Sequence, residues 1–429
     1  MKYSIYNSLL NVSQKTLLLF NSFTDSFFFL HPIVATELKN PVLMKRNHLK
    51  LYRKLVSGGV YVEERVDEFE RLKECSDKVL FNEDSFFLIV NPTMNCNLQC
   101  WYCYEHHLKS SMSVEIYNRI VSLIDNIMRK GISTFTLGFF GGEPLMEYRK
   151  TVSPLIGYAY NLCREYGVEM RVSFTTNGTL LNDKMIAELC EHVKPSFQIT
   201  LDGDESAHDG VRFFKNGKGT YSIILQNVRK LLEYGCRVTL RINYTKESIE
   251  SIWNIIDQFN AFYDTGRNLL TIDFHRVWQD KEGNGVLHSV KLLADKLVEF
   301  GFKVRYNELD EIKNACYGDR MNTAIINYNG DVFKCTAKDF IKENREGVLD
   351  ETGNITWERS QEYRLSLKLK NPLCHQCRIA PLCGGGCSRY ILDKEAVGHS
   401  SYCVFNHNDS EIDEFIVNHV EKLIRNQNK

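Results

Sequence analysis

The 429-residue sequence predicts an α/β protein built around a parallel sheet, with a smaller α+β domain before it and a cysteine-rich domain after it. Three observations support this prediction. From about residue 85 to 300, strand-like and helix-like patterns alternate six times. The first 84 residues mix short strands with helical patterns, and from about residue 303 glycine and cysteine become frequent. The chain is also too long for one ordinary core, so two or three domains are expected.

The first 84 residues are predicted to form a small, winged-helix-like α+β domain. A β-hairpin is expected from residues 4–12 and 16–30, followed by a helical pattern at 43–55 and a charged helix at 66–80. The run 58–62 resembles a short wing strand. The alternative is an N-terminal cap that covers the side of the sheet.

The apolar runs of this domain are not predicted to cross a membrane. Residues 17–20 and 27–30 are separated by mostly polar residues, and neither a basic region nor a small-residue cleavage site accompanies them. A formal net charge of -1 provides no basic field for nucleic acid or an anionic membrane, so neither is expected as a partner. The 14 cysteines fall in short clusters, which favours metal or cluster ligation in a reducing cytosol, and the protein is expected to be cytoplasmic.

The central region has six predicted strand–helix units. The strands are 86–91, 134–140, 170–175, 196–201, 237–243 and 270–276, and the helices are 114–129, 149–166, 183–192, 222–234, 250–262 and 287–300. Reactive groups on parallel barrels lie at the C-terminal ends of the strands. The loops that follow these strands are therefore the expected site.

Three cysteines follow the first of these strands. Cys96, Cys100 and Cys103 lie at positions i, i+4 and i+7 of one loop. Three thiolates can hold three irons of a 4Fe–4S cube and leave the fourth iron open to a ligand, such as the amino and carboxylate groups of methionine. Zinc is an alternative if His106 or His107 supplies a fourth ligand. A chance cluster of buried cysteines is the other alternative.

This loop resembles the signature of the radical S-adenosylmethionine (radical SAM) enzymes, with Tyr102 just before the third cysteine. The runs Gly141-Gly142-Glu143-Pro144, 176–178 and 201–203 follow in the order found in that family. The resemblance covers roughly residues 85–300. It implies the open, partial (β/α)6 barrel of the family, with Cys96, Cys100 and Cys103 as catalytic cluster ligands.

The resemblance also implies contacts to SAM. The Gly141–Pro144 run would bind the methionine amino group, because glycines allow close approach and a carboxylate can pair with an ammonium. Thr200 matches a position near the ribose or carboxylate. Further candidates are Tyr102, Asn177, Arg212 and Asn243. Each of these could equally be a loop polar group satisfied within the protein.

Seven more cysteines lie towards the C-terminus. They are Cys316, Cys335, Cys374, Cys377, Cys383, Cys387 and Cys403. The Gly384–Gly386 run and its neighbours carry too little apolar content for a core, so metal ligation would supply much of the stability. A zinc ribbon is the alternative, although zinc favours four-ligand sites. The remaining Cys75, Cys163, Cys190 and Cys236 are expected to be plain hydrophobic residues.

The spacing of the seven resembles a SPASM domain, which implies two auxiliary 4Fe–4S clusters and three clusters in total. Cys374, Cys377, Cys383 and Cys403 would hold one of them. Cys316, Cys335 and Cys387 would hold the other, with an open iron or a non-cysteine ligand, because residues 319–323 contain no cysteine. The predicted domains are thus 1–84 for leader recognition, 85–302 for the radical SAM partial barrel, 303–410 for the SPASM domain and 411–429 for a C-terminal helix.

The resemblance implies a function in peptide modification. SAM would be cleaved to a 5′-deoxyadenosyl radical that abstracts hydrogen from a ribosomally made precursor peptide, installing a thioether or carbon–carbon crosslink. The precursor's leader would add a strand to the N-terminal domain, and a flavodoxin- or ferredoxin-type protein would donate electrons.

Two alternatives remain open. One is an anaerobic sulfatase-maturing, formylglycine-forming enzyme. That group has an Asp directly after the cysteine that matches Cys335, whereas this chain has Thr336, and the nearest acid is Asp339. Asp339 is a candidate general base, or else a solvated loop carboxylate. The other alternative is a non-catalytic iron–sulfur electron-transfer protein.

Overall fold

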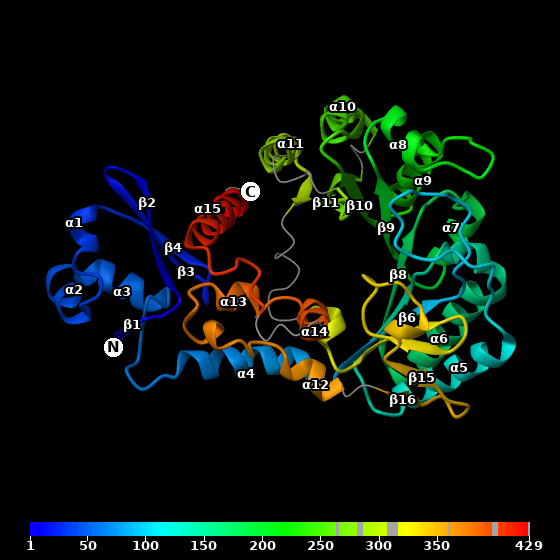
Figure 1. The fold of residues 1–429 in the computed structure, drawn as a ribbon, viewed down its shortest axis with the longest axis horizontal. Helices are drawn as coiled ribbons and strands as arrows, with labels where there is room; N and C mark the ends of the chain where they lie inside the picture. The colour runs from blue at the N-terminus through cyan, green and yellow to red at the C-terminus, as the bar shows by residue number, and fades with distance from the viewer. Residues whose placement is uncertain (263–265, 281–285, 307–315, 359–360, 397–401, 428–429) are drawn as a thin grey trace. The chain divides into compact units, whose positions relative to one another are not determined.

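The computed structural model describes the chain except residues 263–265, 281–285, 307–315, 359–360, 397–401 and 428–429 (Figure 1). The chain divides into two compact units. One comprises Met1–Asn82, Leu309–Met321 and Ser360–Lys429, and the other comprises Glu83–Glu308 and Asn322–Arg359. We call them the terminal unit and the sheet unit. These units cut across the predicted domain 303–410, since residues 322–359 belong to the sheet unit; the four-domain division stays a prediction.

The sheet unit contains the predicted parallel sheet. Its six central strands, in spatial order as in the sequence, are β6 (Ser85–Asn91), β7 (Thr134–Phe139), β8 (Glu169–Thr176), β9 (Ser196–Leu201), β10 (Arg237–Tyr244) and β11 (Leu270–Arg276). Neighbouring strands are parallel throughout, as in the register that pairs Phe86 with Phe135. The six predicted strands are therefore confirmed.

The sheet extends beyond the six strands at both edges. The added strands are β12 (Lys303–Arg305), parallel to β11, then β13 (Thr323–Asn327), parallel to β6, followed by antiparallel β14 (Asp331–Phe333), β15 (Gly347–Leu349) and β16 (Ile355–Trp357). These strands span three to five residues each. Such short runs show too little periodicity to be recognised in the sequence.

Helices follow the strands and lie along the outer face of the sheet (Figure 1). They are α5 (Val114–Met128), α6 (Ser153–Tyr166), α7 (Asp183–Cys190), α8 (Glu205–Val211), α9 (Tyr221–Glu233), α10 (Trp253–Phe262) and α11 (Leu287–Glu299). Helix α5 begins where the Ser113 side chain accepts the N–H of Ile116, and it buries Ile120 and Ile124 in the core. The helix predicted from residue 149 begins instead at Ser153, after a 3₁₀ turn (Pro144–Glu147) and a π turn (Tyr148–Val152).

The terminal unit begins with two small antiparallel sheets. The first pairs β1 (Lys2–Tyr3) with β5 (Tyr61–Val62), and the second has the order β2 (Asn7–Ser13), β3 (Thr16–Asn21) and β4 (Ser26–Leu30). The predicted hairpin arm 16–30 is thus two strands, which corrects that part of the prediction. The Asn21 side-chain oxygen accepts hydrogen bonds from the N–H groups of Phe23 and Thr24 and so stabilises the turn between β3 and β4.

The first and last parts of the chain share a core within the terminal unit. Its helices are α1 (Pro32–Ala35), α2 (Pro41–Asn47), α3 (Leu49–Ser57), α4 (Glu68–Leu80), α12 (Gln361–Ser366), α13 (Ala380–Cys383), α14 (Ser388–Ala396) and α15 (Asp409–Gln427). Phe20 of β3 packs in one apolar cluster with Leu382 of α13 and Ile416 of α15. The cysteine-rich segment therefore obtains apolar partners from the N-terminal sheet. Among the described helices, none is long and apolar enough to span a lipid bilayer.

Candidate functional site

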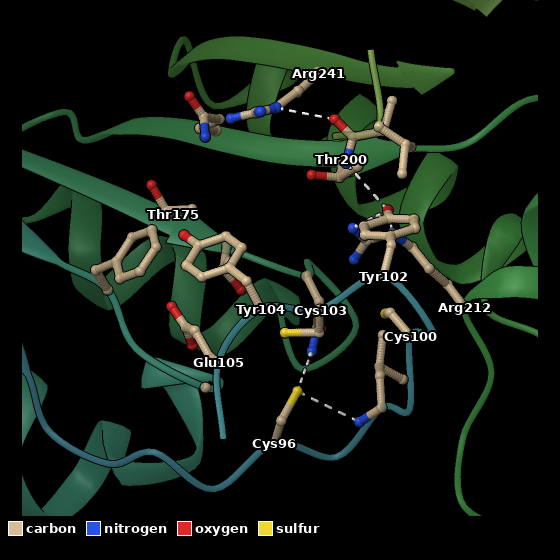
Figure 2. Close-up of a pocket in the computed structure, with 18 of the residues that line it drawn as sticks. Cys96, Cys100, Tyr102, Cys103, Tyr104, Glu105, Thr175, Thr200, Arg212 and Arg241 are labelled. Carbon is tan, nitrogen blue, oxygen red and sulfur yellow. Dashed lines mark hydrogen bonds between the residues drawn. The ribbon is translucent and has the colours of Figure 1, made fainter. Parts of the chain in front are cut away.

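A cavity lies at the C-terminal ends of the parallel strands (Figure 2). It encloses about 990 Å³, including its open mouth. We call it the strand-end cavity. Its walls include the cysteine loop, the ends of β7 and β8, and side chains of β9, β10 and β11: Cys96, Leu98, Cys100, Tyr102, Cys103, Tyr104, Glu105, His107, Phe140, Gly141, Gly142, Thr175, Thr176, Asn177, Gln198, Thr200, Arg212, Arg241, Asn243, Arg276, Val277, Trp278 and Gln279.

The three predicted cysteines of the loop all line this cavity. Burial, with a smaller effect of the neighbouring Cys100, raises the pKa of the Cys96 thiol to about 12 and of the Cys103 thiol to about 11. The Leu98 N–H lies 3.5 Å and the Asn177 side-chain amide 3.8 Å from the Cys96 sulfur. Two dashed lines meet at the Cys96 sulfur in Figure 2. Such donors favour a thiolate.

The three thiols face one cavity, an arrangement that can hold a multi-iron cluster. In a 4Fe–4S cube each thiolate binds its own iron, so its ligands need not meet at one point. Cation ligation also displaces thiol protons that burial otherwise retains.

The two glycines after β7 bring their turn against the cysteine loop. A Cβ at Gly142 would lie 2.4 Å from the Asn95 carbonyl oxygen, and one at Gly141, whose φ is +104°, would lie 2.5 Å from the Thr93 oxygen. The Gly142 N–H donates to Thr93, and the Glu143 N–H donates to Asn95. Only glycine permits this backbone approach. Both glycines also line the strand-end cavity.

Glu143 is fully buried and is not among the residues that line the cavity. Its carboxylate accepts hydrogen bonds from Thr176 Oγ1 at 2.8 Å, the Asn177 N–H at 2.8 Å and the Leu145 N–H at 3.0 Å. Burial raises its pKa to about 7. Glu143 therefore joins the ends of β7 and β8 and positions Asn177, while buried Pro144 begins the following turn. Their contact with SAM stays a prediction.

Tyr102 connects three polar side chains at the wall of the cavity. Its hydroxyl donates to Asp202 Oδ1 at 2.5 Å and accepts from Arg212 Nη2 at 2.6 Å and from Asn243 Nδ2 at 3.1 Å. Arg212 Nε also donates to Asp202 Oδ2 at 2.5 Å. Burial raises the pKa of the Asp202 carboxyl and of the Tyr102 phenol. The Tyr102 hydroxyl thus brings together two predicted residues, Arg212 and Asn243, with Asp202, which was not predicted as a site residue from the sequence.

The remaining predicted SAM contacts, Asn177 and Thr200, also line the cavity. Gln198 and Arg241 also line the cavity and were not predicted from the sequence, although they lie two residues before Thr200 and Asn243 on the same strands. Side chains at i and i+2 of a strand share one face. Polar residues at alternate positions of otherwise apolar strands were therefore a usable signal.

Asp339 lies beside His106 and is not among the residues that line the cavity. It accepts the His106 N–H at 3.1 Å and is hydrogen-bonded to the His106 imidazole. Glu105 does line the cavity, and burial together with the Asp339 charge raises the Glu105 pKa to about 8. A general-base role for Asp339 stays a prediction, and Glu105 is an acidic group that the sequence analysis missed.

Four of the seven C-terminal cysteines are close to one another in the terminal unit. Burial, together with the neighbouring Cys383, Cys377 and Cys403, raises the pKa of the Cys374 thiol to about 12. Cys316 and Cys387 also lie in the terminal unit, whereas Cys335 lies in the sheet unit. Their ligation of clusters stays a prediction.

The single cysteines expected to be hydrophobic include one close pair. Cys190 and Cys236 have sulfur atoms 3.5 Å apart.

Residues 90–259 match the model of the radical SAM superfamily. The chain therefore contains a radical SAM domain, and its α/β fold with a parallel sheet is the one that such domains share. Enzymes of this superfamily bind SAM and a 4Fe–4S cluster.

Individual relatives cover different shares of the chain. Fe-coproporphyrin III synthase of Methanosarcina barkeri is 32% identical over 41% of this chain, and this match spans 42% of the relative's length. The cysteine-type anaerobic sulfatase-maturating enzyme of Clostridium novyi is 23% identical over 71% of this chain and 88% of its own length. The crystal structure of SuiB of Streptococcus suis bound to S-adenosylmethionine covers 92% of this chain and 97% of its own, with a TM-score of 0.51 and 15% identity. Another SuiB structure, with a TM-score of 0.50, contains the precursor peptide SuiA.

Proposed function

We propose that this protein is a radical SAM peptide maturase that installs a thioether or carbon–carbon crosslink in a ribosomally made precursor. The observation that carries the proposal is the extent of its likeness to SuiB, a fold that spans 92% of this chain. The match to the sulfatase-maturating enzyme spans 71%. The N-terminal sheet of the terminal unit has an outer strand, β4, that a peptide could extend.

The residues of the strand-end cavity have complementary tasks in this proposal. When bound, SAM and the cluster would supply the radical that takes a hydrogen atom from the substrate. Cys96, Cys100 and Cys103 would hold the cluster, and the close packing at Gly142 sets the position of their loop. The Tyr102 hydroxyl fixes the orientation of Arg212 and Asn243, which can then bind carboxylate or hydroxyl groups of SAM without prior reorganisation.

The terminal unit would carry an auxiliary 4Fe–4S cluster on Cys374, Cys377, Cys383 and Cys403. The mutual effect of these thiols on their pKa values supports this assignment. Cys316, Cys335 and Cys387 would hold the second auxiliary cluster. An external flavodoxin- or ferredoxin-type protein would supply the electrons.

The precursor's leader would add a strand to the edge formed by β4. Strand β4 is an outer strand of its sheet, and Phe29 on it is 52% exposed. The adjacent Phe28 ring packs against the end of α3, where a Cβ at Gly58 would lie 2.8 Å from it. Main-chain hydrogen bonds along such an edge provide affinity, and the exposed aromatic side chain provides selectivity.

The first test measures iron and SAM cleavage in anaerobically reconstituted protein. About twelve irons per chain are expected for three clusters, with 5′-deoxyadenosine released after addition of dithionite and SAM. A precursor encoded beside the gene should increase this release. About four irons would contradict the auxiliary clusters, and full iron without deoxyadenosine would favour an electron-transfer protein. Formylglycine formation on a cysteine-containing sulfatase peptide would instead identify a sulfatase-maturing enzyme.

The leader site is tested with two exposed apolar residues of the same small sheet. Phe29→Asp should weaken binding of a fluorescent leader peptide at least tenfold, since it places a charge beside the β4 edge. Val12→Asp on β2, where the side chain is 54% exposed, is the matched control and should bind normally. The opposite pattern would assign the leader to β2, and two normal variants would contradict strand addition to this sheet.

A further inference from the structure

A buried lysine lies beside the cysteines of the terminal unit. The Lys368 side chain is only 2% exposed, although lysine is almost never fully buried without a partner. Its Nζ donates a 2.5 Å hydrogen bond to the carbonyl oxygen of Gly386 and lies 3.6 Å from Oδ2 of Asp319. Gly386 lies between Cys383 and Cys387 in the sequence, so the lysine places its positive charge against the cysteine-bearing loop.

The backbone around Lys368 is shaped for this contact. The next residue, Leu369, has a φ of +58°, in the left-handed region that side chains other than glycine rarely adopt. Gly385 has a φ of +80°, and a Cβ there would lie 2.4 Å from the Leu369 nitrogen. The glycine run therefore lets the loop wrap closely around residues 368–369. A strained leucine persists only where its surroundings over-determine it.

One of the proposed cluster ligands lies one backbone turn from this lysine. The Gly386 carbonyl oxygen accepts from Lys368 Nζ, and the Gly386 N–H donates to the Cys383 carbonyl oxygen at 3.0 Å. Coulomb interactions weaken with distance and strengthen in a buried environment. The buried Lys368 ammonium therefore lies where it can stabilise negative charge on the loop that carries Cys383.

Asp319 neutralises this ammonium only in part. Its carboxylate is 2% exposed and also lies 3.5 Å from Nε of Arg364, and the Ser388 hydroxyl donates to it. Its single negative charge is thus shared between two cations and a hydroxyl. Because of this sharing, part of the Lys368 field remains available to the neighbouring cysteines.

We propose that Lys368 raises the reduction potential of the 4Fe–4S cluster that Cys374, Cys377, Cys383 and Cys403 would hold. This inference rests on the auxiliary cluster proposed above. One-electron reduction adds one negative charge to such a cluster, with no bond broken and no proton transferred. A buried ammonium stabilises the more negative state more strongly. The Lys368 charge would thus make this cluster a better electron acceptor.

The test is a dithionite titration of the full-length, anaerobically reconstituted protein, followed by electron paramagnetic resonance. Lys368→Met should lower one midpoint potential by at least about 59 mV, which corresponds to a tenfold change in a one-electron equilibrium. The signal that moves should be the one that Cys377→Ala removes. Lys370→Met, which changes a 50% exposed lysine two residues away, is the matched control and should leave all potentials unchanged.

Two further variants keep the test decisive if Lys368→Met does not assemble its clusters. Asp319→Asn removes a negative charge and should move the same potential upwards, while Lys368→Arg should retain the wild-type value. A Lys368→Met protein with full iron content and the wild-type midpoint potential would overturn this inference alone. If Lys368→Met does not assemble its clusters, Asp319→Asn with full iron and the wild-type potential would do the same. Wild-type protein without a Cys377-dependent signal would overturn the auxiliary cluster and this inference together.

Discussion

At the level of single residues, the phenol of Tyr102 joins three polar side chains of the candidate site. It donates to Asp202 and accepts from Arg212 and Asn243. The tyrosine therefore organises groups that come from the cysteine loop, the segment after β9 and strand β10.

Tyr102→Phe is expected to weaken SAM binding about tenfold. Loss of the hydroxyl leaves buried polar partners unsatisfied, which costs about 1–3 kcal/mol and allows Arg212 and Asn243 to reorient. Calorimetric titration of SAM into reconstituted protein measures the change. Tyr158→Phe removes a comparable 2.7 Å hydrogen bond to Asp125 outside the cavity and should bind SAM normally. Equal affinities for the two variants would exclude an organising role for Tyr102.

Gly142→Ala is expected to displace the cysteine loop and reduce the iron content by about four per chain, the content of one 4Fe–4S cluster. Its Cβ would lie 2.4 and 2.5 Å from two backbone oxygens, which cannot move aside as a flexible side chain could. Iron and sulfide analysis with circular dichroism measures the effect. Gly157→Ala, where the added Cβ meets nothing within 4 Å, should load iron fully. Full loading of the Gly142 variant would show that the loop tolerates displacement.

At the level of elements, helix α8 begins beside the site and carries a fully buried histidine. His208 Nδ1 accepts the Asp202 N–H at 3.2 Å, and its Nε2 lies 3.0 Å from Thr220 Oγ1. Burial lowers its pKa to about 3. The neutral ring therefore holds the backbone of the residue that pairs with Arg212.

The His208 environment predicts a loss of stability in mild acid. Since its folded pKa lies below the unfolded value of about 6.5, the unfolded chain binds the proton more tightly, and stability falls as the pH falls from 6.5 towards 3. The contribution is about 2 kcal/mol between pH 7.5 and 5. Urea unfolding at both pH values should show a smaller difference for His208→Gln than for wild type. His192→Gln, at an exposed histidine, is the control. If the change in unfolding free energy between the two pH values is the same in His192→Gln and His208→Gln, the assignment to His208 is refuted.

At the level of the whole molecule, the first 82 residues and the cysteine-rich C-terminal segment form one compact unit. The apolar core that joins β3, α13 and α15 is small. Ligation of iron–sulfur clusters would therefore contribute much of the folding free energy of this unit. The larger apolar core of the sheet unit does not depend on that ligation.

Removal of iron is expected to loosen the two units unequally. After anaerobic chelation, hydrogen–deuterium exchange should increase in residues 371–396, while strands β7–β10 remain protected because their hydrogen bonds are buried in the large core. Comparison of holo- and apo-protein by mass spectrometry measures this. Unchanged exchange in 371–396 would mean that apolar packing alone holds the segment.

The cysteine spacing and the six strand–helix units could be predicted from the sequence because both are local patterns. A buried strand is recognised by an apolar run of a few residues. The cysteine loop is recognised by ligand spacing within eight residues. The strand assignments of β6 to β11 and the convergence of Cys96, Cys100 and Cys103 on one cavity follow from such patterns.

Other features depend on contacts between residues far apart in the chain, which no local pattern records. Strand β13 joins β6 across more than 230 residues, and Glu143 turns away from the cavity to accept three hydrogen bonds. The Tyr102–Asp202 hydrogen bond spans 100 positions, and Lys368 reaches the cysteine loop through a strained turn. A polar side chain in the interior is placed by the partner that satisfies it, and folding brings that partner from elsewhere in the chain.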